Sequence, residues 1–591
     1  MTEHLGLRPH QVRREDRADG SILLQSGYAL GPVDRSTGVW LDRWANATPE
    51  ALFLAERSGP GWHTLSYTET RDRVRALAAG LLARRLEGPI LILSGNSVDH
   101  AVLSLAAQYV GLVTVPVAEQ YSLIPAAHKR LKYVADLVKP ALVFAADGDA
   151  YGEALRLVGG PAVCSNVGNS GAMPLADLLR DGGDVEAAHK AVGPETVAKL
   201  LLTSGSTSEP KAVETTHGMM TVNQAQVRDS LPFLDARPPV LVDWLPWNHV
   251  FGGSHNFNLV LANGGALYID DGKPLPALFP RTLENLGLVS GTISFNVPVG
   301  FAQLAAALEA DSGLRETYFR DLDMIFYAGA SLPQETWTKL ERMALDTAGR
   351  MPLITSSWGL TETAPATFLQ HEPAKGAGIV GVPLPGVTAK LLDDGTGRME
   401  VRVKGPNVFA RYHANSEKTA EAFDDEGFFR TGDAMRFVDA EVMERGLQFD
   451  GRLSEDFKLS SGTWVHAAQI RLEMLTCLGP FAQDVVVCGH GRDALGILIV
   501  PGPEARGGQV DNGALLSDVT SNIRERMQEI AEVTTGSARC VVRALVLADP
   551  PDIGAGEVTA KGNINFARLL ERRAELVARL YDDDDPASIL I

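Results

Sequence analysis

Apolar runs alternate with amphipathic stretches through the first part of the chain. Residues 69–86 place apolar side chains at helical spacing, and residues 89–93 form a short apolar run that predicts a buried strand. A helix at 100–110, a strand at 113–117 and a further helix and strand within 131–145 follow. This alternation predicts a parallel, doubly wound sheet that binds ligands at the carboxyl ends of its strands.

The pattern changes in the second half of the chain. Residues 381–392, 398–403 and 407–412 predict short β elements without helices between them, whereas helices and strands alternate again towards the C-terminus. The sequence therefore predicts an α/β fold with two domains. Residues 1–451 form a large N-terminal domain of doubly wound sheets with a β-rich subdomain, and residues 452–591 form a smaller, mobile α+β C-terminal domain.

A cluster of hydroxyl side chains separates two predicted strands, residues 197–202 and 212–216. The cluster surrounds one glycine, and the N–H groups and hydroxyls of such a loop can converge on a polyphosphate. A lysine at the end of the loop supplies a positive charge suited to phosphate oxygens. A Ser/Thr-rich surface turn is the alternative interpretation. The candidate phosphate-binding residues are Thr203, Ser204, Gly205, Ser206, Thr207 and Lys211.

Aromatic residues lead into the glycine pair at residues 252–253. A strand that starts at residue 240 would deliver them to this turn, and residues 291–298 predict a second strand and turn of the same type. Aromatic rings with an imidazole suit a flat, aromatic ligand, and a core aromatic cluster with a hydrogen-bonded histidine is the equal alternative. The candidates on the two segments are Trp247, His249, Phe251, Phe295 and Asn296.

Small residues follow the predicted strand that ends at Tyr327. Gly329 and Ala330 leave room for a planar group against the backbone, although an ordinary strand–helix turn looks similar.

Two carboxylates also follow predicted strands or turns. Thr361 and Glu362 place a hydroxyl beside a carboxylate, which suits phosphate and Mg²⁺, although threonine in such a position also caps helices. Asp433 follows a predicted tight turn, where a carboxylate can accept hydrogen bonds from both ribose hydroxyls, or can form an Asx turn.

Composition and charge narrow the class of protein. The net charge of -19 argues against nucleic acid or an anionic membrane as the main partner. The four cysteines form no Cys-x-x-Cys pair, which is typical of a reducing, cytoplasmic compartment rather than of a disulfide framework or a zinc site. The first 20 residues lack the apolar core of a secretory signal, and no apolar run is long enough to span a bilayer. We expect a cytoplasmic protein, and the sequence leaves a homodimer open.

Taken in order, these motifs resemble those of the acyl-adenylate-forming superfamily, which includes acyl- and aryl-CoA ligases, luciferases and peptide-synthetase adenylation domains. Further segments resemble the bacterial feruloyl-CoA synthetases, which make CoA thioesters of hydroxycinnamic acids. The superfamily motifs are at residues 203–211, 328–333, 358–362, 431–433 and 451–452. The segments of the narrower branch are 243–249, 268–274, 455–459 and 561–565.

The resemblance implies a two-step ligase that uses ATP, Mg²⁺, CoA and an aromatic carboxylic acid. Lys211, Thr361 and Glu362 would act on the phosphates, with Glu362 holding Mg²⁺, and His249 would line a channel for the CoA thiol. Adenine and ribose would contact Tyr327, Gly329, Ala330, Trp358, Asp433 and Arg452. The acyl pocket would use Trp247, His249, Phe251, Phe295 and Asn296.

Three positions depart from the superfamily pattern. Ser208 stands where most members have glycine, and Ser454 occupies the hinge position where many relatives carry Asp or Lys. Asn563 stands where the catalytic lysine usually follows a glycine, so we assign that role to Lys561 on the other side of Gly562.

Two other functions remain as alternatives. An adenylation enzyme could transfer the acyl group to the thiol of a carrier protein, and a degenerate member could bind nucleotide without chemistry. Carboxylate-dependent ATP–pyrophosphate exchange distinguishes the degenerate nucleotide binder from the CoA ligase and from the carrier-protein enzyme, because a pure binder shows none.

Overall fold

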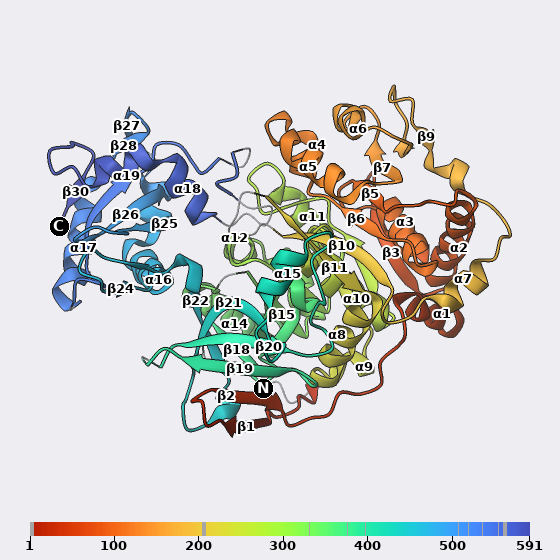
Figure 1. Ribbon diagram of the computed structural model, residues 1–591, viewed down its shortest axis with the longest axis horizontal. Helices are drawn as coiled ribbons and strands as arrows, with labels where there is room; N and C mark the ends of the chain where they lie inside the picture. The colour runs from red at the N-terminus through yellow and green to blue at the C-terminus, as the bar shows by residue number, and fades with distance from the viewer. Residues whose placement is uncertain are drawn as a thin grey trace. The chain divides into compact units, whose positions relative to one another are not determined.

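The computed structural model (Figure 1) describes residues 5–203, 209–329, 331–374, 376, 378–395, 397–505, 507–517, 519–534, 536–552, 555–558 and 564–591. Six candidate site residues lie outside the described residues: Ser204, Gly205, Ser206, Thr207, Ala330 and Lys561.

The chain divides into two compact units. The first contains Met1–Asp393, Val401–Thr431 and Arg436–Phe449, and the second contains Asp394–Glu400, Gly432–Met435 and Asp450–Ile591. The domain boundary between residues 451 and 452 stays a prediction. Among the described residues, no helix has both the length and the apolar character needed to cross a bilayer.

The predicted doubly wound sheet is present in the first unit. Its described strands lie in the order β11-β10-β6-β5-β7-β8-β9, and β11 is antiparallel to β10. On β5, Ile90 and Ile92 share a core with helices α2 and α3, whereas Leu91 and Leu93 pack with α5 on the other face. The strands are β5 Ile90–Leu93, β6 Thr114–Pro116, β7 Leu142–Asp147, β8 Ala162–Asn166, β9 Met173–Pro174, β10 Val197–Thr203 and β11 Lys211–Thr216.

This face-by-face packing follows from the period of two along a strand, because successive side chains of a buried strand must meet different layers. The helices around this sheet are α2 Tyr67–Ala83, α3 Val98–Tyr109, α4 Glu119–Leu123, α5 His128–Val138, α6 Gly152–Val158, α7 Val185–Ala191 and α8 His217–Ser230.

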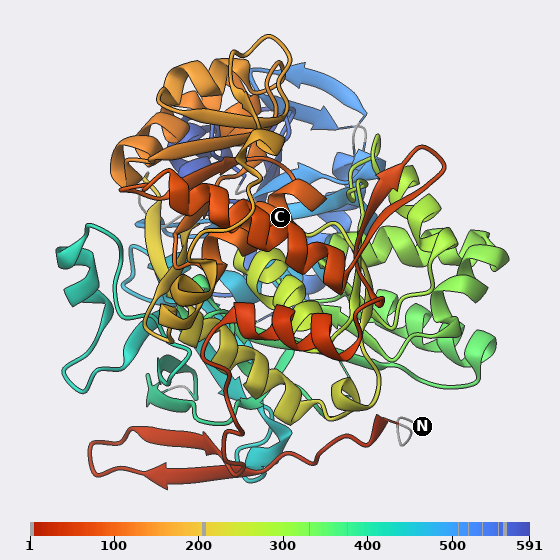
Figure 2. The same cartoon turned by 90° about the vertical axis from the view of Figure 1, so that its right-hand side faces the viewer.

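A second, larger sheet contains the β-rich region. Among the described strands its order is β1-β2-β19-β20-β21-β22-β18-β17-β16-β15-β14. Its strands are β1 Val12–Asp16, β2 Ile22–Ser26, β14 Ile293–Asn296, β15 Met324–Tyr327, β16 Leu353–Gly359, β17 Ala366–Leu369, β18 Ile379–Pro383, β19 Thr388–Asp393, β20 Met399–Lys404, β21 Phe429–Phe437 and β22 Leu447–Arg452. The first two strands form an N-terminal hairpin, drawn in red in Figure 2.

Two predictions for this region are wrong. Residues 407–412 form no strand, and only Tyr412 makes an isolated bridge, with Val213. Asp433 lies inside β21 rather than after a tight turn, with Gly432 before it at φ +73°.

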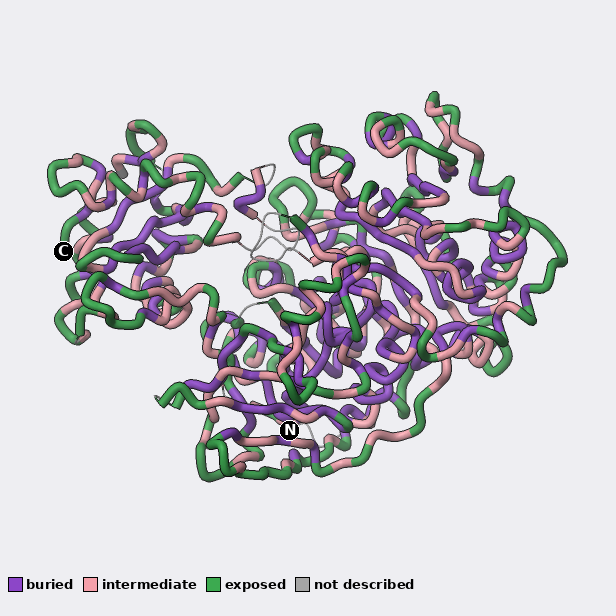
Figure 3. Tube along the Cα trace, in the orientation of Figure 1, coloured by how far each residue is buried: buried purple, intermediate pink, exposed green. Residues whose placement is uncertain are grey.

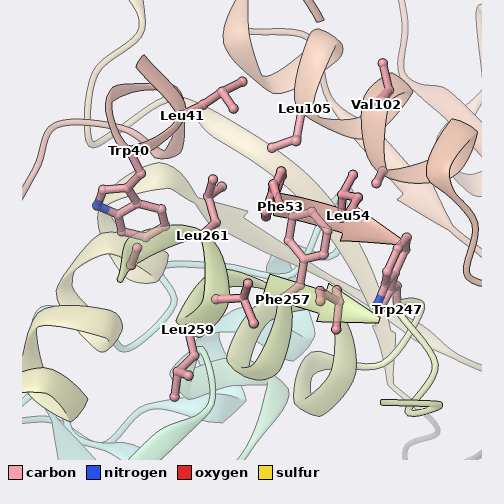
Figure 4. Packing of buried hydrophobic residues seen from close by; sticks show 14 of the residues in the cluster. Trp40, Leu41, Phe53, Leu54, Val102, Leu105, Trp247, Phe257, Leu259 and Leu261 are labelled. Atoms are coloured by element: carbon pink, nitrogen blue, oxygen red, sulfur yellow. The ribbon is translucent and has the colours of Figure 1, made fainter. Parts of the chain in front are cut away.

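A third sheet in the first unit has the order β12-β13-β3-β4 among the described strands. Its core holds Phe53, Leu54, Phe257 and Trp247, which Figure 4 shows close together. Its strands are β3 Leu52–Ser58, β4 Gly61–Ser66, β12 Val240–Asp243 and β13 Ala266–Ile269. The remaining helices of the unit are α1 Thr37–Ala47, α9 Phe233–Ala236, α10 Phe257–Ala262, α11 Phe279–Leu288, α12 Pro298–Ala310, α13 Ser312–Arg320, α14 Gln334–Ala348 and α15 Ser416–Ala422.

The second unit is the small α+β fold that the sequence predicts. Its main sheet has the described order β25-β26-β29-β30, and its buried strand residues appear purple in Figure 3. This sheet has its own core with Ile470 of α16 and Ile523 of α17. The elements are β25 Ala482–Cys488, β26 Leu495–Pro501, β27 Gly508–Asp511, β28 Ala514–Ser517, β29 Val541–Val546, β30 Ile589–Leu590, α16 Ala467–Leu478, α17 Thr520–Val533, α18 Phe566–Arg572 and α19 Ala574–Leu580. The short strands β23 Phe457–Lys458 and β24 Trp464–Val465 pair with each other.

Candidate functional site

Three neighbouring parallel strands bring candidate residues to one edge of the large sheet. Asn296, the last residue of β14, is the register partner of Tyr327, the last residue of β15. Tyr327 is in turn the partner of Ser356 on β16. Because the strands are parallel, the loops that follow them leave the sheet on the same side. The structure therefore brings the predicted adenine segment, Asn296 and the start of the Thr361–Glu362 turn together.

The predicted adenine residues are ordered by local contacts. Tyr327 is buried, and its hydroxyl oxygen accepts a hydrogen bond of 3.2 Å from the N–H of Gly378. Burial raises the pKa of Tyr327, so its hydroxyl keeps its proton. Gly329 has φ +90° and no atom within 4 Å of the place where a Cβ would stand, so glycine suits this backbone and leaves the space open. Trp358 is buried against Phe368, with ring centroids 5.4 Å apart.

The predicted strand–loop–strand around the phosphate loop is confirmed on both sides of the loop. Thr203 of β10 and Lys211 of β11 are register partners in an antiparallel pair. The Thr203 hydroxyl donates to the Lys211 carbonyl at 3.5 Å. Residues 204–208, which follow Thr203, lie outside the part of the chain that the structure describes.

Lys211 and Glu362 are joined by a residue that we did not single out from the sequence, Tyr412. The Lys211 ammonium donates to the Tyr412 hydroxyl at 3.0 Å, and that hydroxyl donates to Glu362 Oε1 at 2.8 Å. Glu362 is only 8% exposed and lies in the 3₁₀ turn η5, Thr361–Thr363. Leu360 is the residue before this turn, so Thr361 does not cap it. The sequence carried no signal for Tyr412, because the contacts span distant segments.

Burial shifts the pKa values of Lys211 and Tyr412. Burial lowers the pKa of Lys211, and the charge of Glu362 opposes that shift. Burial raises the pKa of Tyr412, and the charge of Glu362 adds to the rise. The tyrosine hydroxyl therefore keeps its proton for Glu362 and offers a lone pair to Lys211.

The donor set fits Mg²⁺ only when the cation arrives with a nucleotide. No group of three or more His, Cys, Asp or Glu side chains within the described ranges could hold a metal ion. Glu362 with the Thr361 hydroxyl offers one carboxylate and one neutral oxygen, and Mg²⁺ commonly binds one or two carboxylates together with substrate phosphates.

The predicted acyl residues divide into two groups. Phe251 and Phe295 meet edge to face at 5.8 Å, and both contact Phe326. His255, which we did not predict, completes this cluster at 5.4 Å from Phe295. The cluster is aromatic and almost fully buried.

Trp247 belongs to the second group. It makes edge-to-face contacts with His100 and Phe257, each at 5.1 Å (Figure 4 shows the Phe257 side). The predicted strand that starts at residue 240 is present as β12, but it ends at Asp243, before Trp247, and Phe251 begins a π-helical turn, η4 Phe251–Asn256. Asn296 accepts a hydrogen bond of 3.2 Å from the Trp244 indole.

His249 lies half-buried just before this turn. Its Nδ1 accepts a hydrogen bond of 3.2 Å from the N–H of Phe251. An accepting Nδ1 carries no proton, so the proton of the neutral imidazole is on Nε2. The backbone of Phe251 thereby orients the ring.

Lys199 connects β10, the strand before the phosphate loop, to the π-helical turn η4. We did not single it out from the sequence. It is 6% exposed on β10, and its ammonium donates to the Gly253 carbonyl at 2.8 Å. Burial lowers its pKa to about 8. The available signal was a lysine within an otherwise apolar predicted strand, since a lysine is almost never fully buried without a partner.

Three other predicted residues belong to the second unit. Asp433 is 2% exposed, and its Oδ1 lies 3.5 Å from Nε of the half-exposed Arg452. Ser454 is exposed in the 3₁₀ turn η7, Leu453–Glu455. On both sides of this turn, Asp450 and Asp456 form ion pairs with the buried Arg398, at 3.3 and 2.5 Å.

Comparison with known proteins agrees with this organisation. The chain is 24% identical over 583 residues to a long-chain-fatty-acid–CoA ligase of Mycobacterium bovis, a match that covers 88% of this chain and 93% of the ligase. It is 26% identical over 597 residues to a carboxylic acid reductase of Segniliparus rugosus, which covers 88% of this chain and 47% of the reductase. The chain thus spans about half the length of that second relative.

A solved structure and two family models identify the fold and the family. The crystal structure of ATP-bound MatB from Rhodopseudomonas palustris superposes with a TM-score of 0.68 at 21% identity, and the match covers 92% of this chain and all of MatB. This likeness confirms the large N-terminal and smaller C-terminal α/β architecture. Residues 457–585 match the C-terminal domain of AMP-binding enzymes. Residues 41–413 match the AMP-binding enzyme model, so the chain belongs to the AMP-binding enzyme family.

Proposed function

We propose that this protein is an ATP-dependent acid–thiol ligase that forms an acyl-CoA thioester through an acyl-adenylate. The observation that carries the proposal is the chain of contacts from Lys211 through Tyr412 to Glu362, beside the hairpin closed by Thr203. These contacts support a site in which Lys211 binds phosphate and Glu362 binds a phosphate-bound metal, in a chain that belongs to the AMP-binding enzyme family.

In the first step, an oxygen of the substrate carboxylate attacks the α-phosphorus of ATP. The bond from that phosphorus to the bridging oxygen of the β-phosphate breaks, and pyrophosphate leaves. Lys211, Thr361 and the loop hydroxyls would offset the negative charge that develops at phosphorus. Glu362 would hold Mg²⁺, which when bound supplies further positive charge to the phosphates.

Binding of the nucleotide would order the reactants for this attack. Tyr327, Gly329, Ala330 and Trp358 would contact the adenine, and Asp433 with Arg452 would hold the ribose. Holding carboxylate and phosphorus in line supplies much of the rate of such a reaction.

In the second step, the CoA thiolate attacks the carbonyl carbon of the acyl-adenylate and AMP leaves. Because AMP is a good leaving group and a thiol of pKa about 8.5 is partly ionised near neutral pH, no enzyme nucleophile is required. His249 would line the thiol channel. Ser454 would act as the hinge between the two steps, and Lys561 would act in the first step alone.

The acid that we propose is aromatic, of the hydroxycinnamic class. Phe251, Phe295 and Asn296 support this choice, since two of them belong to an aromatic cluster that suits a planar ring. The resemblance to feruloyl-CoA synthetases in residues 243–249 and 561–565 points to the same class. The reaction would take place in the cytoplasm, and a homodimer stays a prediction.

Carboxylate-dependent ATP–pyrophosphate exchange tests the proposal. A panel of cinnamic, benzoic and fatty acids is supplied with ATP and Mg²⁺, and thioester is then measured with CoA as acceptor. We expect exchange with hydroxycinnamic acids and a CoA-dependent thioester product. Exchange with no acid would overturn the ligase proposal, exchange with fatty acids alone would overturn the acid class, and exchange without thioester would favour a carrier-protein acceptor.

A further inference from the structure

Hydrogen bonds of the surrounding backbone hold the segment that carries Tyr412. Residues 411–413 run antiparallel to β11, with an isolated bridge from Val213 to Tyr412. The His413 N–H donates to the Ala212 carbonyl at 2.8 Å, and the Tyr412 N–H donates to the Thr419 hydroxyl at 3.0 Å. The position of the phenol is therefore set from two sides.

Two contacts with the carboxylate of Glu214 reinforce this placement. Glu214 of β11 accepts hydrogen bonds from Arg411 Nε at 2.7 Å and from His413 Nδ1 at 3.0 Å. These residues flank Tyr412 on both sides, so the segment that carries the phenol is attached to the strand that begins with Lys211. A shift of β11 would carry Tyr412 with it.

The same segment holds Glu362 at two points. The Phe409 N–H donates to the Glu362 backbone carbonyl at 2.8 Å, and the Tyr412 hydroxyl donates to the Glu362 carboxylate at 2.8 Å. The rings of Phe409 and Tyr412 pack with centroids 4.8 Å apart. The carboxylate is thus held by a hydroxyl whose ring and backbone are both fixed.

The Tyr412 hydroxyl acts as both donor and acceptor in this network. It has one proton, which it donates to Glu362, and a lone pair that accepts from Lys211. The Lys211 ammonium also lies 4.1 Å from the centroid of the same ring. One side chain thereby fixes both the cation and the carboxylate.

We propose that Tyr412 is the positioning residue that presents Glu362 and Lys211 to Mg·ATP, an inference that rests on the proposed function. The hydroxyl holds the carboxylate in the orientation that a phosphate-bound cation meets, and it holds the ammonium within reach of the phosphates until the nucleotide takes it. The network makes binding of the metal–nucleotide complex, and not of the acid, dependent on this hydroxyl.

The test compares the full-length wild type with Tyr412→Phe, which keeps the ring and its packing on Phe409 and removes the hydroxyl that bonds Lys211 and Glu362. Calorimetric titrations with Mg·ATP, and with ATP in the presence of EDTA, give two dissociation constants that do not depend on turnover. We expect the dissociation constant for Mg·ATP to rise about tenfold, because a hydrogen bond to a charged group is lost. The constant for ATP in EDTA should rise less than threefold, and the KM for the acid should stay within twofold.

Tyr67→Phe is the matched control. Tyr67 is buried in the same unit, and its hydroxyl donates to the Gly265 carbonyl at 2.9 Å. This variant loses a comparable buried hydrogen bond, so it should leave both dissociation constants unchanged even where its melting temperature falls.

Several outcomes would overturn the inference. An unchanged Mg·ATP constant in Tyr412→Phe would refute it, as would equal weakening with and without Mg²⁺ together with a lower melting temperature, which indicates a structural role only. A wild type that does not bind Mg·ATP refutes it too. Binding that depends on Tyr412 without any pyrophosphate exchange would support the inference and overturn the ligase. Normal pyrophosphate exchange, with Mg·ATP binding unaltered in Tyr412→Phe, would support the ligase and overturn the inference.

Discussion

Arg398 forms a buried ion pair with Asp456, with 2.5 Å between Nη1 and Oδ2. Its guanidinium also lies 3.3 Å from Asp450, on the other side of the turn that carries Ser454. The side chains of Arg398 and Asp456 are 2% and 5% exposed, so neither charge is well solvated. One arginine thereby fixes the chain before and after the proposed hinge.

Removal of this arginine should destabilise the second unit. Arg398→Met leaves two carboxylates in poorly solvated surroundings. We expect the free energy of unfolding, measured by chemical denaturation, to fall by about 3–5 kcal/mol. Arg445→Met is the control, because its ion pair with Asp439 is largely exposed and should contribute less than about 1 kcal/mol. Equal stability of the two variants would contradict this interpretation of the Arg398 cluster.

The carboxyl group of Asp243 should make stability depend on pH. Burial raises its pKa to about 7, although Asn256 donates to its Oδ2 at 2.9 Å. Between pH 4 and 7 the folded protein holds a proton that the unfolded chain has lost, so stability falls as pH rises through this range. Relative to Asp243→Asn, the wild type should lose up to about 1.4 kcal/mol per pH unit in denaturation experiments.

The exposed Asp235 provides the control for this experiment. The free energy of unfolding of Asp235→Asn should change with pH in parallel with that of the wild type. If Asp243→Asn also ran parallel to the wild type from pH 4 to 7, the carboxyl would be ionised throughout and our assignment wrong.

A change in the aromatic cluster should alter the choice of acid. Phe295→Leu keeps much of the buried volume but removes the ring that packs on Phe251 and Phe326. We expect the KM for a hydroxycinnamic acid to rise about tenfold, consistent with the loss of an aromatic contact, whereas the KM for ATP stays within twofold. Phe319→Leu, a buried phenylalanine next to Tyr318, controls for a general loss of packing. Equal effects of the two variants on the acid KM would argue against an acyl pocket at Phe295.

Lys561 should act in only one half-reaction. Lys561→Ala should abolish ATP–pyrophosphate exchange, because the lysine would stabilise charge at the α-phosphate, and should leave thioester formation from supplied acyl-adenylate largely intact. Loss of the second half-reaction alone would assign Lys561 to a different step.

The pattern of apolar positions predicted the doubly wound sheet and the strands on both sides of the phosphate loop. Residues 90–93 alternate between two cores, as a buried parallel strand must, and residues 197–216 contain the two strands that were predicted on either side of the phosphate loop. These features depend on neighbours in sequence. Their periodicity is therefore visible without coordinates.

Contacts between distant segments were not accessible in this way. Residues 407–412 have the apolar and aromatic content of a strand, yet a single bridge at Tyr412 is their only β pairing among the described residues. That bridge joins positions about 200 residues apart, which no local period encodes. The alternating positions of Trp247 and Phe251 misled in a similar way, since β12 ends before Trp247 and Phe251 begins a π-helical turn.

The N-terminal hairpin covers the β19 side of the large sheet and makes the charged, largely exposed strand β1 its outermost strand. Strand β2 pairs with β19 from Ile22 with Leu391 to Gln25 with Thr388, and the Gln25 amide also donates to the Thr388 hydroxyl at 2.8 Å. A chain shortened to begin after Ser26 would leave a row of N–H and C=O groups on β19 without their partners. Such an unpaired strand edge pairs with strands of other molecules, so we expect the hairpin to protect the protein from aggregation.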